Sequence, residues 1–308
     1  MPTSPWIVLA AAALDAAVGY PEALHRRVPH PVVWIGALIS RLEVTLNRAD
    51  WTQARRRVLG VATLAIIVTV SGGVGWIVTK LGGPYAVAII GAVGLAQRSL
   101  FDHVAAVGGA LTRDDLEAAR LAVGRIVGRD VERLDASGIA SAAIESLAES
   151  FNDGVVAPIF WFVAGGLPGL FVYKAVNTAD SLIGHREPRW RAFGWASARF
   201  DDVLNLIPAR LAGALIALAA GRGWSVMARD AGKHASPNAG WPEAAMAGAL
   251  GARLGGEAWY DGNRIDRPIL GGGRPARPED LRRGLRVYVT ACAILWLALA
   301  LGGFAWPR

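Results

Sequence analysis

Three groups of polar side chains between residues 137 and 210 have the types and spacing that catalysis needs. In the first group, Glu145, Glu149, Asn152 and Asp153 recur at steps of three and four residues, which places them in one stripe along a helix. Like charges at that spacing repel by about 0.2–0.5 kcal/mol per pair. A Mg²⁺ ion or a cationic substrate group would offset this repulsion, because hard cations take carboxylate and amide oxygens as ligands. The alternative is an ordinary solvated helix face.

The second group follows about twenty residues later and contains Lys174, Asn177, Asp180 and Ser181. Lys174, Asn177 and Ser181 fall on one face of a helix. A lysine binds phosphate as a point charge, and Asn177 and Asp180 have the oxygen atoms to share a metal ion. The simpler interpretation is a helix end with a lysine that reaches toward the membrane surface.

In the third group, the adjacent Asp201 and Asp202 lie between Arg199 and Arg210. Two carboxylates beside two guanidinium groups suggest a clamp for phosphate and Mg²⁺. An ion pair between Arg199 and Asp202, three residues apart on a helix, is the competing explanation. Asn238 lies in a Ser-Pro-Asn-Ala-Gly stretch that is primarily a turn, and it is a further candidate for substrate contact.

The elements that position these groups are expected to lie in a membrane. The 308 residues are 53% hydrophobic, and the runs Val58–Val78 and Val287–Trp306 contain no charge over 21 and 20 residues. At about 1.5 Å per residue, each run covers the roughly 30 Å of bilayer hydrocarbon. We therefore predict an all-α, polytopic integral membrane protein without a sheet of more than two strands. About four transmembrane helices are expected, near residues 6–19, 58–79, 84–101 and 287–306.

Two further apolar segments are interrupted. Val155–Val176 contains Gly165-Gly166-Leu167-Pro168-Gly169, and Val203–Ala220 contains Asn205, Pro208 and Arg210. An arginine in mid-membrane costs at least about 2.5 kcal/mol, and broken helices are tolerated where they line a protein or water-filled cavity. We expect two re-entrant or buried elements that shape a polar site; two kinked spans are the alternative.

The remaining chain is expected to form a polar loop at 20–57 and a soluble helical insertion at 101–150, within a single membrane-embedded domain of residues 1–308. The net charge of +7 comes largely from arginines that flank apolar runs. This is the positive-inside pattern, so we expect a lipid bilayer and no nucleic acid as the partner. The same pattern predicts that residues 41–57, 101–202 and 277–286 lie in the cytoplasm. The single cysteine, Cys292, excludes an intramolecular disulfide.

The three polar groups and the segments around them resemble those of the adenosylcobinamide-phosphate synthase family, the CbiB/CobD membrane proteins of cobalamin assembly. The resemblance covers nearly the whole chain. The segments that carry it are Leu14–Pro21, His30-Pro31-Val32, Arg125–Asp130, Glu145–Pro158, Tyr173–Gly184, Phe193–Arg210 and Pro237–Gly256.

The resemblance implies an ATP-dependent amide ligase in the cell (inner) membrane, with its active site facing the cytoplasm. Its substrates would be adenosylcobyric acid, a corrinoid, and (R)-1-amino-2-propanol O-phosphate or ethanolamine phosphate, with ATP and Mg²⁺ as cofactors. Other cobalamin-pathway enzymes are possible partners. Under this interpretation the catalytic candidates are Glu145, Glu149, Lys174 and Asp180. The candidates for substrate or phosphate binding are Asn152, Asn177, Ser181, Arg199, Arg210 and Asn238. The metal candidates are Asp153, Asp201 and Asp202.

Two other classes of function fit parts of the sequence. Broken helices and intramembrane charges also occur in transporters, although the spans are few and no internal repeat is visible. A non-catalytic membrane scaffold for cobamide enzymes is the third possibility.

Overall fold

A computed structural model describes residues 2–21, 25–260 and 262–306. The described residues form two compact units. Unit 1 comprises those within Met1–Ala96, Ala157–Asn205 and Leu299–Arg308, and unit 2 those within Gln97–Val156 and Leu206–Ala298. Each unit is assembled from stretches of chain far apart in the sequence, and the expectation of a single membrane-embedded domain stays a prediction.

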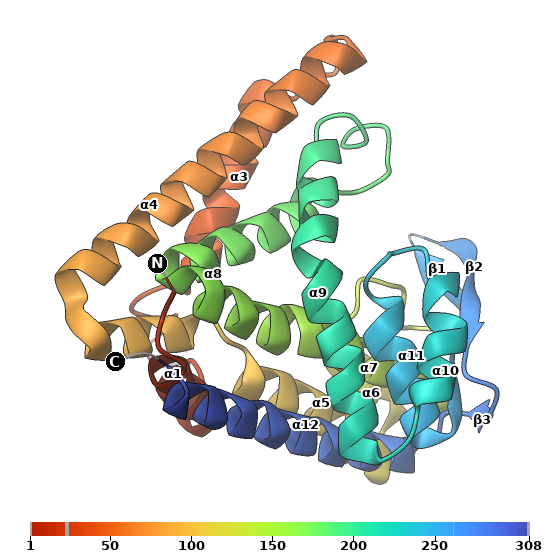
Figure 1. The fold of residues 1–308 in the computed structure, drawn as a ribbon. Helices are drawn as coiled ribbons and strands as arrows, with labels where there is room; N and C mark the ends of the chain where they lie inside the picture. The colour runs from red at the N-terminus through yellow and green to blue at the C-terminus, as the bar shows by residue number, and fades with distance from the viewer. Residues whose placement is uncertain (1, 22–24, 261, 307–308) are drawn as a thin grey trace. The chain divides into compact units, whose positions relative to one another are not determined.

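Unit 1 is helical (Figure 1). Its helices are α1 (Pro5–Val18), α3 (Pro31–Leu46), α4 (Gln53–Val93), α8 (Ala157–Ile183) and the first turns of α9 (Trp195–Ala220). Helix α3 lies inside the segment predicted to be a polar loop, so that prediction is wrong for these 16 residues. The helix begins at His30, whose Nδ1 accepts a hydrogen bond from the Val32 amide while Nε2 lies 3.0 Å from the Val93 carbonyl oxygen.

Glycine and proline interrupt both long helices of unit 1. Helix α4 is kinked at Gly83, which has φ of 65° and precedes Pro84. Helix α8 is kinked at Gly166, again with φ of 65°, two residues before Pro168. A positive φ is accessible to glycine at little cost, and proline cannot donate the next helical hydrogen bond. The predicted interruption at 165–169 is confirmed, and the kink at Gly83 lies between the two predicted spans 58–79 and 84–101.

Helices α4 and α8 approach closely where α4 has glycine. A Cβ atom added to Gly75 would lie 2.7 Å from the Pro168 nitrogen and 2.8 Å from the Leu167 carbonyl, whereas one added to Gly73 would meet nothing within 4 Å. Backbone atoms cannot move aside as the end of a flexible side chain can, so only glycine fits at position 75.

We therefore expect Gly75→Ala to destabilise the protein by about 1–3 kcal/mol, the usual cost of overpacking. Gly73→Ala, two residues away on the same helix, should leave stability equal or slightly higher, because alanine favours the helix. Thermal denaturation of the detergent-purified variants measures both. Equal melting temperatures for the two variants would contradict the close packing of α4 on α8.

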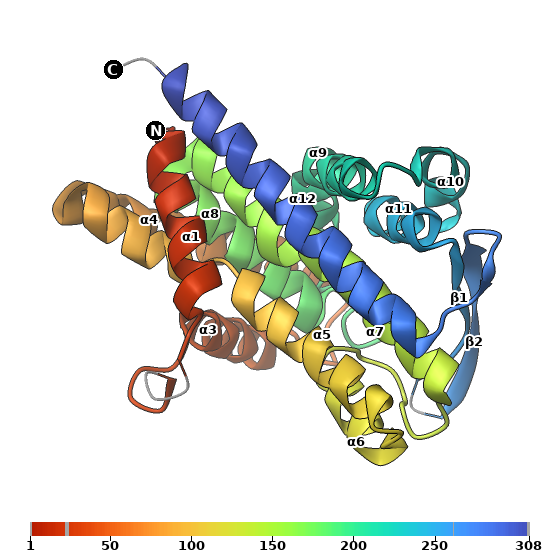
Figure 2. The ribbon, with the colours of Figure 1, turned by 90° about the horizontal axis from the view of Figure 1, so that it is seen from below.

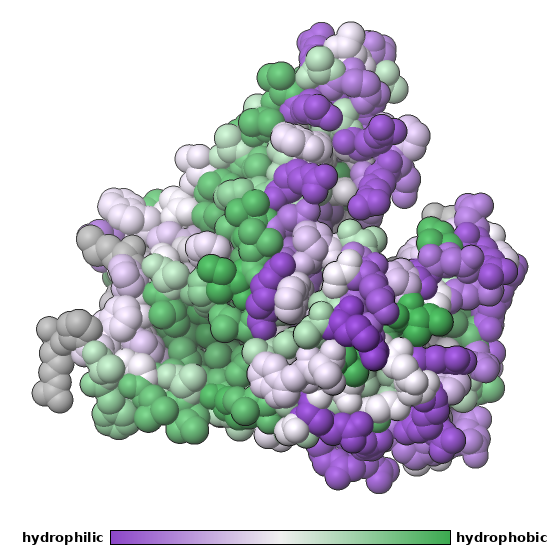
Figure 3. Space-filling model, turned by 45° about the vertical axis from the view of Figure 1, so that its right-hand side comes forward, coloured by the Kyte–Doolittle hydropathy of each residue, from purple (hydrophilic) through white to green (hydrophobic). Residues whose placement is uncertain are grey.

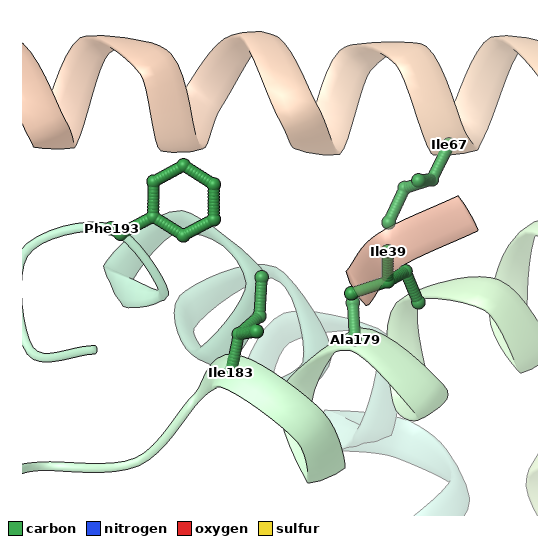
Figure 4. Close-up of a cluster of buried hydrophobic side chains, with 5 residues drawn as sticks. All are labelled: Ile39, Ile67, Ala179, Ile183 and Phe193. Carbon is green, nitrogen blue, oxygen red and sulfur yellow. The ribbon is translucent and has the colours of Figure 1, made fainter. Parts of the chain in front are cut away.

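The buried centre of unit 1 joins four segments. Ile39 of α3, Ile67 of α4, and Ala179 and Ile183 of α8 pack with Phe193, which lies just before α9 (Figure 4). All five side chains are at most 2% exposed. This cluster fixes both ends of the segment that connects α8 to α9.

Unit 2 combines helices with a small sheet (Figure 2). Its helical elements are α5 (Gln97–Thr112), α6 (Leu116–Val123), α7 (Ala136–Phe151), the π-helical turn η1 (Asn152–Val156), the second part of α9, α10 (Trp224–Asp230), the 3₁₀ turn η2 (Ala231–Lys233), α11 (Gly240–Leu250) and most of α12 (Pro278–Phe304). Helices α10 and α11 lie side by side next to the strands. The predicted helical character of residues 101–150 is confirmed.

The sheet corrects one prediction. Strands β1 (Ala252–Tyr260), β2 (Asn263–Leu270) and β3 (Arg274–Pro275) form a sheet in the order β2-β1-β3, where two strands at most were expected. Strands β1 and β2 are antiparallel, with a register shift between Leu254 and Gly256. This irregularity and the many charges of β2 remove the regular apolar alternation by which strands are found in a sequence.

The fold class of a polytopic helical membrane protein is confirmed. Within the described residues, four helical stretches are long and apolar enough to cross a membrane: Gln53–Thr112, Ala136–Ile183, Trp195–Ala220 and Pro278–Phe304. Exposed apolar side chains such as Val58, Trp76 and Leu301 lie along them, and Figure 3 shows hydrophobic surface gathered in continuous areas. Surface of this kind suits contact with lipid.

Three of the four predicted spans are found in these stretches: 58–79 and 84–101 lie within Gln53–Thr112, and all but the last two residues of 287–306 lie within Pro278–Phe304. Helix α1 has 14 residues and is too short to belong to this group. The interrupted segments at 155–176 and 203–220 instead lie within two of the long helices. Whether either segment crosses the membrane or re-enters it stays a prediction.

Candidate functional site

A pocket of about 410 Å³ lies wholly within unit 2 and is lined by Glu145 and Glu149 of the first predicted group. Helix α7 supplies one wall, and the segments before α11 and on β2 supply others. The residues that line the pocket are Ile126, Val127, Gly128, Arg129, Ala142, Glu145, Ser146, Glu149, Ser150, His234, Ala235, Tyr260, Ile265 and Arg267.

Glu145 is the buried carboxylate of this pocket. It is 3% exposed, and its Oε2 lies 2.8 Å from Nη2 of Arg129 and 2.6 Å from Nη1 of Arg267. Its Oε1 accepts hydrogen bonds from the Gly255 amide at 3.0 Å and from the Ser141 hydroxyl at 2.8 Å. A buried carboxylate is stable only when it is paired and hydrogen-bonded in this way. Two arginines therefore provide positive charge beside the acidic stripe.

A second buried carboxylate, Glu243 of α11, lies behind the lining of the pocket. It is 1% exposed, and its two oxygens are 3.6 Å from Nε2 of His234 and 3.6 Å from Nη2 of Arg267. Its Oε2 accepts no hydrogen bond from the described residues. Burial, together with the nearby charges of Glu149 and Glu145, raises the pKa of Glu243 well above its ordinary value.

The raised pKa of Glu243 predicts a pH-dependent effect of Glu243→Gln. The folded protein holds the carboxyl proton to a higher pH than the unfolded chain does. Wild-type stability therefore falls as pH rises above the ordinary value of 4.5 and through the folded pKa. Glutamine does not titrate, so the variant should gain melting temperature relative to wild type at pH 8 and gain less at pH 5.

Glu257→Gln on β1 is the matched control, because the Glu257 side chain is 48% exposed. Thermal denaturation at both pH values measures the effect. A Glu243→Gln shift that is the same at pH 5 and pH 8 would show that Glu243 is ionised in the folded protein.

The other predicted residues of unit 2 form two local pairs. The Asn152 amide donates a hydrogen bond to Asp153 Oδ1 at 2.7 Å, inside the π-helical turn. Arg210 Nη1 donates to Asn238 Oδ1 at 2.8 Å, and its guanidinium group lies 4.7 Å from the centre of the Trp241 ring. Arg210 and Asn238 were predicted separately and are brought together by the fold.

The second predicted group belongs to unit 1, as do Arg199, Asp201 and Asp202 of the third, and α8 and α9 bring part of these residues together. The Asn177 amide donates to Asp201 Oδ1 at 3.4 Å, and the Asn205 amide donates to Asp201 Oδ2 at 3.0 Å. The Tyr173 hydroxyl donates to Asn205 Oδ1 at 3.1 Å. The predicted alternative for Asp202 is confirmed, since Arg199 Nη1 lies 3.4 Å from it.

Lys174, Asp180 and Ser181 lie on α8 in the same unit. The Ser181 hydroxyl donates to the Asn177 carbonyl at 3.0 Å. Asp180 Oδ1 lies against Gly184, at a distance that leaves no room for a Cβ atom there. Glu145 belongs to unit 2 and these residues to unit 1, so their convergence on one polar cavity stays a prediction.

A bound Mg²⁺ ion would need oxygen ligands in addition to the carboxylates that the described residues bring together. Among the described residues, no three His, Cys, Asp or Glu side chains are placed to hold a metal ion. Asp153, Asp201 and Asp202 each accept a hydrogen bond from a neighbouring side chain. One or two of these carboxylates can still bind Mg²⁺ if the remaining ligands are water and substrate phosphate oxygens, which is the usual arrangement for this ion.

Four site residues were not singled out from the sequence as functional candidates: Arg129, His234, Glu243 and Arg267. Arg129 lies in the quoted segment Arg125–Asp130, and Glu243 in the quoted segment Pro237–Gly256. His234 and Arg267 gave no local signal. The three basic residues contact Glu145 or Glu243 only in the folded protein. Their spacing along the chain therefore does not reveal these contacts.

Comparison with known proteins places the chain in a family. Residues 8–288 match the family described as CobD/Cbib protein. The chain is 49% identical to cobalamin biosynthesis protein CobD of Rhodobacter capsulatus, with 97% of this chain and 98% of that protein covered. It is 47% identical to the protein of the same name from a Sinorhizobium species and 43% identical to that of Rhizobium meliloti, with 94% and 96% of this chain and 95% of each relative covered. No solved structure matches. The chain belongs to the CobD/Cbib protein family of cobalamin biosynthesis.

Proposed function

We propose that this protein is the ATP-dependent amide ligase that joins the free propionate of adenosylcobyric acid to an amino-alcohol phosphate, giving adenosylcobinamide phosphate. The observation that carries the proposal is the match of nearly the whole chain to a cobalamin-biosynthesis family. The polar pocket of unit 2 supports it, because it gathers carboxylate, guanidinium and imidazole groups around one cavity.

The proposed reaction has two steps. The propionate oxygen attacks the γ-phosphorus of ATP, which forms an acyl phosphate and releases ADP. The amine of the amino-alcohol phosphate then attacks the acyl carbon, the amide C–N bond forms, and inorganic phosphate leaves with the C–O bond electrons. Mg²⁺, when bound, would neutralise charge on the phosphates of ATP.

The residues of this chain would bind, orient and move protons in that scheme. Lys174 and Arg199 would hold phosphate oxygens through charge-assisted hydrogen bonds. A carboxylate would take the proton that the attacking ammonium group must lose. Glu149 is the exposed carboxylate of the unit 2 pocket, whereas Glu145 is engaged with two guanidinium groups.

Hydrolysis of ATP by the detergent-purified protein, with and without its substrates, tests the proposal. An amide ligase should release ADP in the presence of adenosylcobyric acid and (R)-1-amino-2-propanol O-phosphate and form adenosylcobinamide phosphate, detected by mass spectrometry. A transporter would instead accumulate a corrinoid in proteoliposomes without forming the amide. A scaffold would do neither.

We also propose that the protein lies in the cell inner membrane with its active site facing the cytoplasm. The arginine-rich ends of the apolar helices and the cytoplasmic origin of ATP support this orientation. Reporter fusions after residue 190 should give a cytoplasmic signal and fusions after residue 308 a periplasmic one. A periplasmic signal at residue 190 would show that the interrupted segment 155–176 is a full span.

A further inference from the structure

A second pocket, of about 550 Å³, lies wholly within unit 1 and is strongly basic. The residues that line it are Gly184, His185, Arg186, Arg191, Trp195, Ala198, Arg199 and Asp202. They come from the segment between α8 and α9, residues 184–194, and from the first turns of α9. Three guanidinium groups and an imidazole face one carboxylate, and that carboxylate is paired with Arg199 at 3.4 Å. The pocket therefore carries a net positive charge.

The ends of the 184–194 segment are fixed to each other and to the core. Ile183 and Phe193 are both buried in the cluster drawn in Figure 4. A Cβ atom added to Gly194 would collide with the Ile183 carbonyl, so only glycine allows the two ends to approach this closely. The Gly194 amide also donates to the Trp190 carbonyl at 2.7 Å.

A clasp of hydrogen bonds, formed by buried Glu43 and Arg56 with Asn47 and the exposed Arg189, holds the middle of the same segment. Arg189 turns to α3, where its Nε and Nη2 donate to the two oxygens of Glu43 at 3.0 and 2.9 Å. Arg56 of α4, 5% exposed, donates to the Pro188 and Arg189 carbonyls and, through Nε, to Asn47 Oδ1 at 2.7 Å. The Asn47 amide donates to the Arg189 carbonyl at 3.0 Å. Burial alone would raise the pKa of Glu43, but the hydrogen bonds from Arg189 and Asn47 bring that pKa below its ordinary value.

The clasp distinguishes this segment from arginines that merely set membrane orientation. The positive-inside effect needs only charge near the end of a span and no fixed geometry. Here a buried glutamate and a buried arginine, each costly to desolvate, keep the backbone at 188 and 189 in one place. The neighbouring Arg186 and Arg191 are left to line the pocket. A fixed backbone beneath exposed arginines is what recognition of an anion requires.

We propose that this basic pocket binds a phosphate group of a larger ligand, held by Arg186, Arg191 and Arg199. Guanidinium groups match phosphate oxygens with paired hydrogen bonds, and the first turns of α9 add the positive end of a helix dipole. Trp195 provides an apolar wall beside the anion. The phosphate can belong to a soluble polyphosphate or to the headgroup of an anionic lipid. The inference does not rest on the proposed ligation, because binding can be measured without turnover.

Titration calorimetry with tripolyphosphate, on protein reconstituted in phosphatidylcholine nanodiscs, tests the site. The double variant Arg186→Gln/Arg191→Gln should bind at least about tenfold more weakly than wild type. The control Arg41→Gln/Arg48→Gln removes the same charge from exposed arginines of unit 1 that do not line the pocket, and it should bind as wild type does. Equal weakening in both double variants would overturn the proposal in favour of non-specific attraction to net charge.

The Glu43→Gln variant tests whether the clasp positions the arginines for binding or whether positive surface charge alone attracts the anion. This variant makes the protein more positive, so charge attraction alone predicts tighter binding of tripolyphosphate. If the clasp positions the segment, the variant should instead bind tripolyphosphate several-fold more weakly. Thermal denaturation verifies that the variant is folded. Binding as tight as or tighter than wild type would overturn the positioning argument.

Nanodiscs that contain phosphatidylglycerol identify the source of the phosphate. If a lipid headgroup occupies the pocket, these discs should weaken tripolyphosphate binding to the wild type and to the Arg41→Gln/Arg48→Gln control. If the ligand is soluble, binding should be the same in both kinds of disc. If phosphatidylglycerol weakens tripolyphosphate binding to the Arg186→Gln/Arg191→Gln variant to the same extent, the headgroup acts elsewhere. That result would overturn the proposal that this pocket binds the headgroup.

Discussion

Replacing Glu145 with alanine is expected to lower the free energy of unfolding by about 3–5 kcal/mol, the usual cost of removing one partner from a buried ion pair. The side chains of Arg129 and Arg267 are 7% and 19% exposed, and both lie within 2.8 Å of the same carboxylate oxygen. Without Glu145, two guanidinium charges would remain close together in a region that water reaches poorly. The Gly255 amide would also lose its acceptor.

Thermal denaturation of detergent-purified protein measures this effect, and a decrease in melting temperature on the order of 10 °C corresponds to it. Glu132→Ala is the control. It removes the same charge from an exposed position of unit 2, shortly before α7. A change within about 0.5 kcal/mol is expected for it, as for most surface substitutions. Equal destabilisation by the two variants would show that Glu145 is not the centre of this ion-pair cluster.

The sequence predicts those features of the fold that have local causes. The kinks at Gly83 and Gly166 follow from glycine and proline chemistry within a few residues. Helix α3 was missed because it lies between a proline-rich start and a basic end, and the whole segment 20–57 was therefore interpreted as a polar loop. In the structure Glu43 is buried against Arg189, a residue 146 positions away. A charged side chain that the fold neutralises looks, in the sequence, like a solvent-exposed one.

In the candidate site, too, the sequence predicts features with local causes and misses contacts between residues far apart in the chain. The recurrence of Glu145 and Glu149 indicated correctly that an acidic stripe in an apolar helix needs positive charge beside it. The sequence favoured a bound cation, whereas the structure provides arginines 16 residues before and 122 residues after Glu145. Glu243 was passed over because its neighbours are alanines and a turn. Its proximity to His234 and Arg267 depends on the packing of α11 against the strands, which local spacing does not encode.

Lys174→Ala and Asp180→Ala are each expected to abolish formation of adenosylcobinamide phosphate while the protein stays folded and inserted. In the proposed reaction Lys174 stabilises charge on a transferring phosphoryl group, and loss of one such contact reduces turnover about 100- to 1,000-fold. Asp180 lies six residues further along α8, with Oδ1 against Gly184 near the end of the helix. Both side chains are partly exposed, and a truncation there should cost less stability than one at Glu145.

The control for these variants is Lys80→Ala, which removes an exposed lysine that stacks on Trp76 in the same unit. Ser146→Ala is unsuitable as a control, because Ser146 lines the unit 2 pocket and its hydroxyl donates to the Ile126 carbonyl at 2.7 Å. Turnover is measured with the purified variants by the formation of the amide product. Their melting temperatures are compared with that of wild type, so that a loss of activity can be separated from a loss of folding. Near-normal turnover of Lys174→Ala and Asp180→Ala would remove α8 from the site and leave the unit 2 pocket, with Glu149 as its exposed carboxylate, as the place where the amide forms.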